Sequence, residues 1–191
     1  MSRKILIDTN TYLRLAVVMD PLVLSEIPGE DGGELWILPD LYKELKRSPR
    51  LSHDFSWMSY PEMVENRKSC RWHLDSDTRS QIESAYQFAL RLSQETQNGA
   101  SPFDIRCLAY GYVLEILVVT DDRDMRLLAD ELEVSHTNTL GLLKRMLDAD
   151  ACDMSKIRSI VQYWIAVDDL PANYRSDFKR HFGENPPMSP Y

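Results

Sequence analysis

Carboxylates next to short apolar runs are the side chains of this chain best suited to chemistry. Asp8 follows the run over 5–7, and Asp122 lies in an acidic cluster behind the run over 116–119. Asp104 and Glu44 fall in the first turns of two expected helices. Four carboxylates at one place repel each other unless a cation lies among them. Oxygen-only ligands favour Mg²⁺ or Mn²⁺, which can activate a water and stabilise charge on a phosphodiester.

Strands and helices that alternate along the chain must position these acids. Their alternation predicts an α/β fold in three layers, with a central, mainly parallel sheet flanked by helices and joined by right-handed crossovers. The strand ends that carry Asp8 and Asp122, and the helix starts that carry Glu44 and Asp104, then lie along one rim of the sheet. The apolar patterns place strands over 5–7, 36–38, 116–119 and 134–137, and helices over 12–18, from 39, from 77 to a stop at 98–99, from 101, and over 124–132, 139–147, 155–167 and 170–183.

The length and composition fit a single globular domain with a core of ordinary size, since 43% of the 191 residues are hydrophobic. We expect residues 1–150 to form that domain, with a helical insertion at about 48–77, where the periodicity fails. Residues 151–191 are expected to form a helical extension packed on the same domain.

The charge balance bounds the choice of partners. A net charge of −8 argues against a generic polyanion binder, because affinity for phosphates normally comes from Lys and Arg. Local basic patches remain open. The cations Arg67, Lys68 and Arg71, with others over 46–50, lie beside aromatic residues and could hold phosphates and bases. The alternative is that these charges are solvated and the aromatic rings are packed.

The cysteines and the hydropathy pattern predict a cytoplasmic protein. Cys70, Cys107 and Cys152 are odd in number and form no CxxC pair, which favours reduced thiols. The start of the chain lacks a signal-peptide pattern, and no later run approaches membrane-spanning length.

Each acid also has a structural interpretation. Asp8 or Thr9 could simply cap the following helix, as could Asp104 within its first turn. Glu44 shares a helix face with Leu41 and Leu45, and could be a boundary residue paired with an arginine. Other catalytic classes are excluded, since the chain lacks a phosphate-binding glycine loop, a dinucleotide fingerprint, a G-x-S-x-G elbow and an H-E-x-x-H zinc motif.

Four motifs, in order, carry a family resemblance: Ile-Leu-Ile-Asp-Thr-Asn at 5–10, the helical Glu44, Ser-Pro-Phe-Asp at 101–104, and Val-Val-Thr-Asp-Asp-Arg-Asp-Met at 118–125. Over 4–147 the chain resembles PIN-domain nucleases, and the wider order is similar to the VapC-like toxins of toxin-antitoxin pairs. The resemblance implies a PIN-like fold and Mg²⁺ or Mn²⁺ as cofactor. The implied catalytic and metal-binding residues are Asp8, Glu44, Asp104 and Asp122; Asn10 and Thr120 would orient them, and Asp121 and Asp124 compete with Asp122 for the fourth ligand position.

The resemblance implies a metal-dependent endoribonuclease, acting as a toxin restrained by an antitoxin protein. RNA would be the substrate, and a homodimer is an open alternative for its assembly. The insertion at 48–77 and the extension after 150 depart from the family pattern. A second hypothesis is a catalytically silent PIN-like module, in which the acids cap helices and the insertion binds a protein partner.

Overall fold

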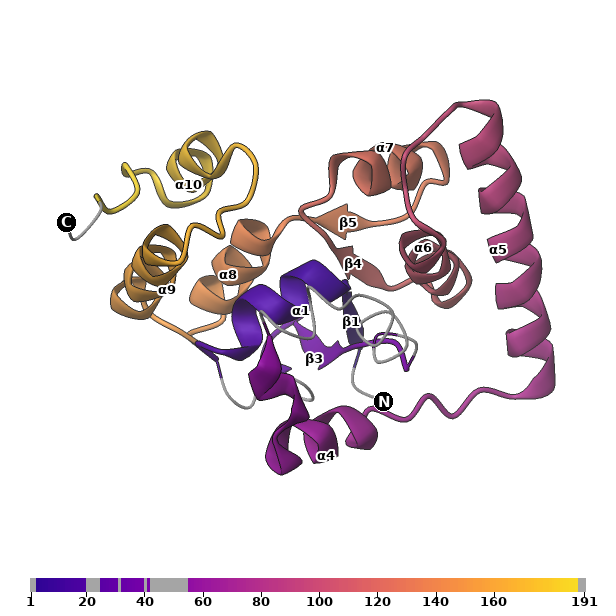
Figure 1. The fold of residues 1–191 in the computed structure, drawn as a ribbon, viewed down its shortest axis with the longest axis horizontal. Coiled ribbons are helices and arrows are strands. Elements are labelled where there is room, and N and C mark those ends of the chain that lie inside the picture. The colour runs from indigo at the N-terminus through magenta and orange to yellow at the C-terminus, as the bar shows by residue number, and fades with distance from the viewer. Residues whose placement is uncertain (1–2, 20–24, 31, 40, 42–54, 189–191) are drawn as a thin grey trace.

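A five-stranded, mostly parallel sheet forms the centre of the computed structural model, which describes residues 3–19, 25–30, 32–39, 41 and 55–188 (Figure 1). The strand order is β2-β3-β1-β4-β5, with β2 antiparallel to β3 and the other neighbours parallel. The strands are β1 (Lys4–Ile7), β2 (Glu26–Ile27), β3 (Gly33–Trp36), β4 (Leu117–Val119) and β5 (His136–Thr137).

The middle strand β1 determines the edge of the sheet at which the acidic residues lie. It pairs with β4 in parallel, with Ile5 opposite Leu117 and Ile7 opposite Val119. The ladder continues one residue further, because the backbone N–H of Asp8 donates to the carbonyl oxygen of Val119 at 3.0 Å. Parallel pairing without offset therefore brings the carboxyl ends of β1 and β4 to one edge of the sheet.

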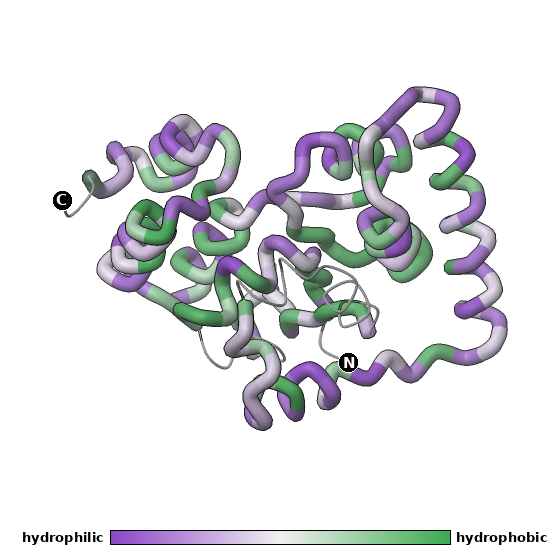
Figure 2. Tube along the Cα trace, viewed as in Figure 1, coloured by the Kyte–Doolittle hydropathy of each residue, from purple (hydrophilic) through white to green (hydrophobic). Residues whose placement is uncertain are grey.

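Helices cover both faces of the sheet, because successive side chains of a strand point to opposite sides. Ile5 and Ile7 pack with α1, α8, α9 and α10 in one apolar cluster, whereas Leu6 and Val118 pack with α5, α6 and α7 in another. Strand β4 is hydrophobic along its whole length in Figure 2. The α/β class with a mainly parallel, helix-flanked sheet is confirmed. The helices are α1 (Thr9–Ala16), α5 (Ser76–Glu95), α6 (Pro102–Leu114), α7 (Arg123–Glu131), α8 (Thr139–Asp148), α9 (Met154–Ala166) and α10 (Tyr174–Phe182).

The strand expected over 36–38 lies earlier in the chain. β3 ends at Trp36, because its partners β2 and β1 pair with residues 33–36. Ile37 and Leu38 are nevertheless buried, at 2% and 8% exposure, just beyond the strand. Their apolar character therefore reflects a buried loop rather than a longer strand.

The insertion expected at 48–77 contains helical elements up to Ser69, and the described residues 70–75 have no regular secondary structure. A 3₁₀ turn, η1 (Ser56–Ser59), is followed by α4 (Pro61–Ser69), and α5 begins at Ser76. Residues 42–54, which include Glu44 and the basic residues of 46–50, lie outside the described part of the chain.

The C-terminal helices are integrated into the core. Trp164 of α9 and Phe178 of α10 are fully buried, and the Trp164 indole N–H donates to the carbonyl oxygen of Arg14 at 3.2 Å. The amide of Asn138, the N-cap of α8, donates to Asp177 of α10 at 2.7 Å. None of the helices in the described ranges combines the length and apolar character that a membrane crossing requires.

Candidate acidic site

Asp8 lies at the carboxyl end of β1 and is the N-cap of α1, with only 5% of its surface exposed. Its Oδ1 accepts the backbone N–H of Thr11 at 2.6 Å, and its Oδ2 accepts the hydroxyl of Thr120 at 2.6 Å. The same Thr120 oxygen accepts the backbone N–H of Asp122 at 3.1 Å. Thr120 thus links the ends of the two central strands and fixes the Asp8 carboxyl group.

Burial raises the pKa of Asp8 from its ordinary 3.8 to about 7, against the opposing effect of the hydrogen bonds from Thr11 and Thr120. The negative charge of Asp121 adds a smaller upward contribution to the same pKa. A capping residue on a solvated helix would not suffer this desolvation, so the buried carboxylate is unfavourable unless a positive charge lies nearby.

Asp104 occupies the first turn of α6, where the sequence pattern predicts it. Ser101 is the N-cap, and the two residues form a capping box in which the backbone N–H of Ser101 donates to Asp104 Oδ2 at 2.8 Å. Burial also raises the pKa of Asp104, and the negative charge of Asp122 contributes in the same direction. Asp104 and Asp122 are therefore electrostatic neighbours, although 18 residues separate them along the chain.

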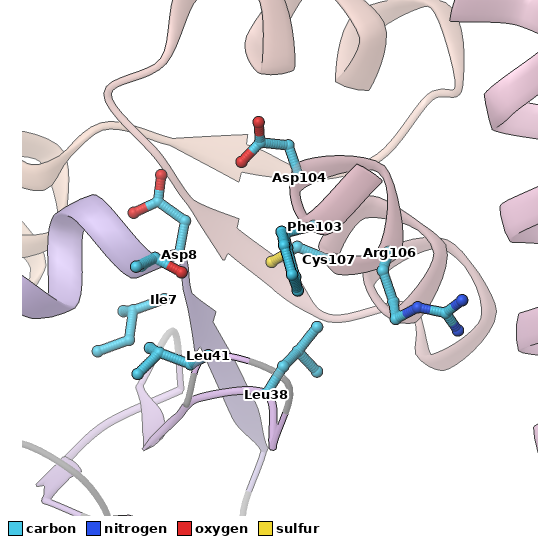
Figure 3. A pocket seen from close by; sticks show the side chains of 9 residues that line it. Ile7, Asp8, Leu38, Leu41, Phe103, Asp104, Arg106 and Cys107 are labelled. Atoms are coloured by element: carbon cyan, nitrogen blue, oxygen red, sulfur yellow. The ribbon is translucent and has the colours of Figure 1, made fainter. Parts of the chain in front are cut away.

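Asp8 and Asp104 line one pocket at the edge of the sheet. Figure 3 shows their carboxyl groups pointing to the same side of it, away from the apolar side chains of Leu38 and Leu41. Phe103 lies between Asp8 and Arg106 in the same view. The pocket thus has an acidic end and an apolar end.

The three clustered aspartates after β4 have different surroundings. Asp122 is the N-cap of α7, where its Oδ1 accepts the backbone N–H of Met125 at 2.7 Å. The Asp124 carboxyl group lies against Gly99, and the Asp124 backbone oxygen accepts the amide of Asn98 at 2.8 Å. Asp124 thus stabilises the turn before α6. The cap of α7 uses only one carboxyl oxygen of Asp122.

Asp121 belongs to a buried ion-pair network. Its Oδ2 accepts Arg14 Nη1 at 2.5 Å and the hydroxyl of Thr139 at 2.5 Å, and its Oδ1 accepts the backbone N–H of Thr139 at 3.0 Å. Arg14 Nη2 also reaches Asp169, after α9, at 2.8 Å. This environment gives Asp121 a structural partner for each oxygen, so Asp122 is the better candidate for a ligand.

Sequence reasoning missed Arg14, whose side chain is only 10% exposed. A signal was present, since Arg14 follows Thr11 by three residues and so shares a face of α1 with it. An arginine on a buried helix face requires an acidic partner. The partner could not be chosen from the sequence, because Asp121 and Asp169 are both far along the chain.

The structure brings some of the predicted acids together and leaves others apart. Asp8 and Asp104 share the pocket, Asp104 and Asp122 are electrostatic neighbours, and Asn10 is exposed in the first turn of α1. Glu44 lies outside the described residues. Within the described ranges no three His, Cys, Asp or Glu side chains lie close enough together to hold a metal ion.

The donor set nevertheless has the chemistry of a site for a hard divalent cation. The groups available are carboxylate and hydroxyl oxygens, which Mg²⁺ and Mn²⁺ prefer. The helix caps use one oxygen each of Asp104 and Asp122, so the second oxygen of each is not needed for the cap. A scan against models of protein families and a search among curated proteins find no match for this chain.

Proposed function

We propose that this chain is a Mg²⁺- or Mn²⁺-dependent endoribonuclease of PIN type that hydrolyses RNA phosphodiester bonds. The observation that carries the proposal is the buried Asp8 carboxyl group, whose pKa is about 7, in one pocket with Asp104. Both acids are held at the edge where the parallel strands end, and Asp122 lies beside Asp104. A cation would offset the repulsion and the desolvation that these groups undergo without one.

In this proposal Asp8, Asp104 and Asp122 hold the ion together with Glu44. The bound ion supplies Lewis-acid chemistry, lowering the pKa of a water and offsetting charge on the phosphate. The chain's own contribution is to fix the ligands: Thr120 orients Asp8, and the Ser101 capping box orients Asp104. Arg14 keeps Asp121 out of the ligand set by pairing with it.

The second candidate is a silent PIN-like module, and one observation favours it. Asp8 and Asp122 are N-caps and Asp104 completes a capping box, so each acid already has a structural role. The two candidates differ in affinity for the ion. Calorimetric titration with Mn²⁺ should show binding to the wild-type protein, and a protein without measurable binding would favour the silent module.

The direct test compares the rate of RNA cleavage by Asp122→Asn with that of the wild-type protein. We expect Asp122→Asn to lower the rate by about a hundredfold or more, since second-shell changes alone cost metal sites 10–100-fold. Asp153→Asn is the matched control, because Asp153 caps α9 through the backbone N–H of Lys156 at 2.8 Å but lies in an exposed cap away from the edge. Equal activity of both variants, or cleavage that persists in excess EDTA, would contradict the proposal.

The proposal extends to a biological role as a cytoplasmic toxin with an antitoxin protein as partner. The order of the sequence motifs supports this role, and three cysteines without a CxxC pair suit a reducing compartment. Induced expression in a bacterial host should arrest growth, and Asp122→Asn should relieve the arrest. Light scattering of the purified chain would decide whether it is a homodimer.

A further inference from the structure

Helix α4 sits on the core without burying any of its nine side chains. It is held instead by Arg67, whose guanidinium donates to the Tyr12 hydroxyl of α1 at 3.3 Å and to the carbonyl oxygen of Met58. A helix that contributes so little to the core is explained better by its exposed surface than by its packing.

The cations of this helix and of the segment that follows it lie on the side that faces the sheet edge. A groove there is lined by Arg67, Lys68 and Arg71, whereas Glu62 and Glu65 of the same helix do not line it. The other described residues that line it are mainly apolar: Ile37, Leu38, Pro39, Leu41, Val64, Cys70 and Trp72. The charge along this groove is therefore positive, opposite to the net charge of −8 of the whole chain.

The groove adjoins the acidic pocket. Leu38 and Leu41 line both, so the apolar end of the pocket that holds Asp8 and Asp104 is also a wall of the cationic groove. A polymer whose scissile group lay against the acids could therefore continue along α4 without leaving the surface.

The two outer cations are available for a ligand. The Lys68 side chain is 59% exposed and pairs with Glu65, which is 72% exposed, so solvent screens this pair strongly. Arg71 is exposed, and its Nε donates to the carbonyl oxygen of Lys68 at 3.1 Å. Neither contact holds the cation in the core.

The wall of the groove is rigid and apolar. The Trp72 indole N–H donates to the Ile37 carbonyl oxygen at 2.9 Å. The ring packs edge-on against Trp36 and Tyr110, with centroids 4.9 and 5.2 Å away. Trp72 is therefore a fixed part of the wall, and its packing agrees with the interpretation that the aromatic rings of this region are structural.

We propose that this groove binds single-stranded RNA on its way to or from the acidic pocket, with Lys68 and Arg71 on the phosphates and the apolar wall against the bases. The proposal rests on the proposed nuclease function. Polynucleotide single strands bind through cations that follow the backbone and apolar or aromatic surfaces that meet the exposed base faces. A duplex hides its base faces within the stack, so the apolar wall favours the single strand.

The test is binding of a fluorescent single-stranded oligouridylate by anisotropy, in excess EDTA so that no cleavage occurs. The double variant Lys68→Gln/Arg71→Gln removes both outer cations. Two matched controls are available. Arg79→Gln/Arg91→Gln removes the same charge from exposed positions on α5 that do not line the groove. Glu65→Gln breaks the same ion pair while leaving Lys68 charged.

Loss of two phosphate contacts should make the slope of log affinity against log salt shallower by about 1.4, at about 0.7 per contact for single strands. At about 50 mM salt the affinity of Lys68→Gln/Arg71→Gln should fall roughly tenfold or more. Glu65→Gln should bind as tightly as wild type or tighter, and Arg79→Gln/Arg91→Gln should change little.

Three results would overturn the proposal: no binding by the wild type, an unchanged salt slope in Lys68→Gln/Arg71→Gln, or an equal loss of affinity in Arg79→Gln/Arg91→Gln. Either of the first two results would favour a protein as the partner of the groove. The result also separates the groove from the nuclease activity. If the oligonucleotide binds as expected but the protein does not cleave RNA in the presence of Mg²⁺ or Mn²⁺, the proposed nuclease function is refuted and the RNA-binding groove is retained. If the protein cleaves RNA but Lys68→Gln/Arg71→Gln leaves its affinity for the oligouridylate unchanged, the nuclease function is retained and the RNA-binding groove is refuted.

Discussion

Replacing Asp8 with asparagine should stabilise the metal-free protein while abolishing its proposed activity. Asparagine and aspartate are equivalent N-caps, so the bond from the Thr11 backbone N–H to Oδ1 can persist. The side-chain amide can face the Thr120 hydroxyl in place of the second carboxyl oxygen, since a hydroxyl can also accept. What changes is that the buried position no longer carries an ionisable group.

The magnitude follows from the pKa of Asp8, which is 3.8 in an ordinary setting and about 7 in the fold. Between these values the folded state binds a proton that the unfolded state has released, so the free energy of unfolding falls as the pH rises. At about 1.4 kcal/mol per pH unit, the full cost of ionising Asp8 above pH 7 is on the order of 4 kcal/mol. Of this, about 3 kcal/mol should develop between pH 5 and pH 8.

Urea unfolding in EDTA at pH 5 and pH 8 measures this effect. The stability of Asp8→Asn relative to wild type should increase by about 3 kcal/mol from the lower to the higher pH, because all other titrations are shared. Asp75→Asn is a control without pH dependence over this interval. The hydrogen bond from the Thr78 backbone N–H lowers the pKa of that exposed cap, so Asp75 is ionised in the folded and the unfolded state at both pH values. A difference between Asp8→Asn and wild type that is independent of pH, or a less stable variant at pH 8, would refute the reasoning.

Added Mn²⁺ should narrow the difference in stability between wild type and Asp8→Asn at pH 8. An ion that binds only the folded state stabilises it by about 2.7 kcal/mol at a hundredfold excess over its dissociation constant. Wild type should gain this stabilisation, and Asp8→Asn should gain much less. Equal gains in the two proteins would place the ion elsewhere.

Three further experiments test the site and its surroundings. Arg14→Met should lower the free energy of unfolding by about 3–5 kcal/mol, because it leaves the buried Asp121 carboxylate unpaired; urea unfolding should show partial recovery when Asp121→Asn is added. In a cleavage assay Asp122→Asn should be more damaging than Asp121→Asn, whereas thermal melts should show the larger loss of stability for Asp121→Asn. Gly111→Ala should cost about 1–3 kcal/mol in urea unfolding, since its new Cβ would lie 2.5 Å from a Val118 methyl carbon unless α6 moves away from β4.

Much of the fold could be predicted because its signals are local. The apolar runs before Asp8 and Asp122 are strands, and Ser101 with Asp104 caps a helix as the pattern indicates. Parallel pairing then follows from the alternation of strands and helices, so the shared edge could be predicted too. The end of β3 could not, because Ile37 and Leu38 are as apolar as strand residues and only the pairing partners set the limit.

The distribution of roles within the acidic cluster depends on contacts between distant residues. Asp121 and Asp122 are adjacent and chemically identical, yet one meets Arg14 and the other caps α7. Nothing near them in the sequence identifies Arg14 as the partner. For Asp104 and Asp122 the cap interpretation and the ligand interpretation were also not exclusive, since one carboxyl oxygen makes the cap and the other is not needed for it.

The contacts between Arg14 and the end of the chain have a consequence for how the protein folds during synthesis. Arg14 meets Asp169 across a separation of 155 residues, and Trp164 across 150. At a translation rate of about 5–20 residues per second, roughly 8–30 s pass between the appearance of these partners. During that interval Arg14, and through it Asp121, lacks its last neutralising contact. Folding of the acidic edge is therefore coupled to the synthesis of α9 and Asp169, and a ribosome-stalled nascent chain that ends before α9 should not yet present it in its final form.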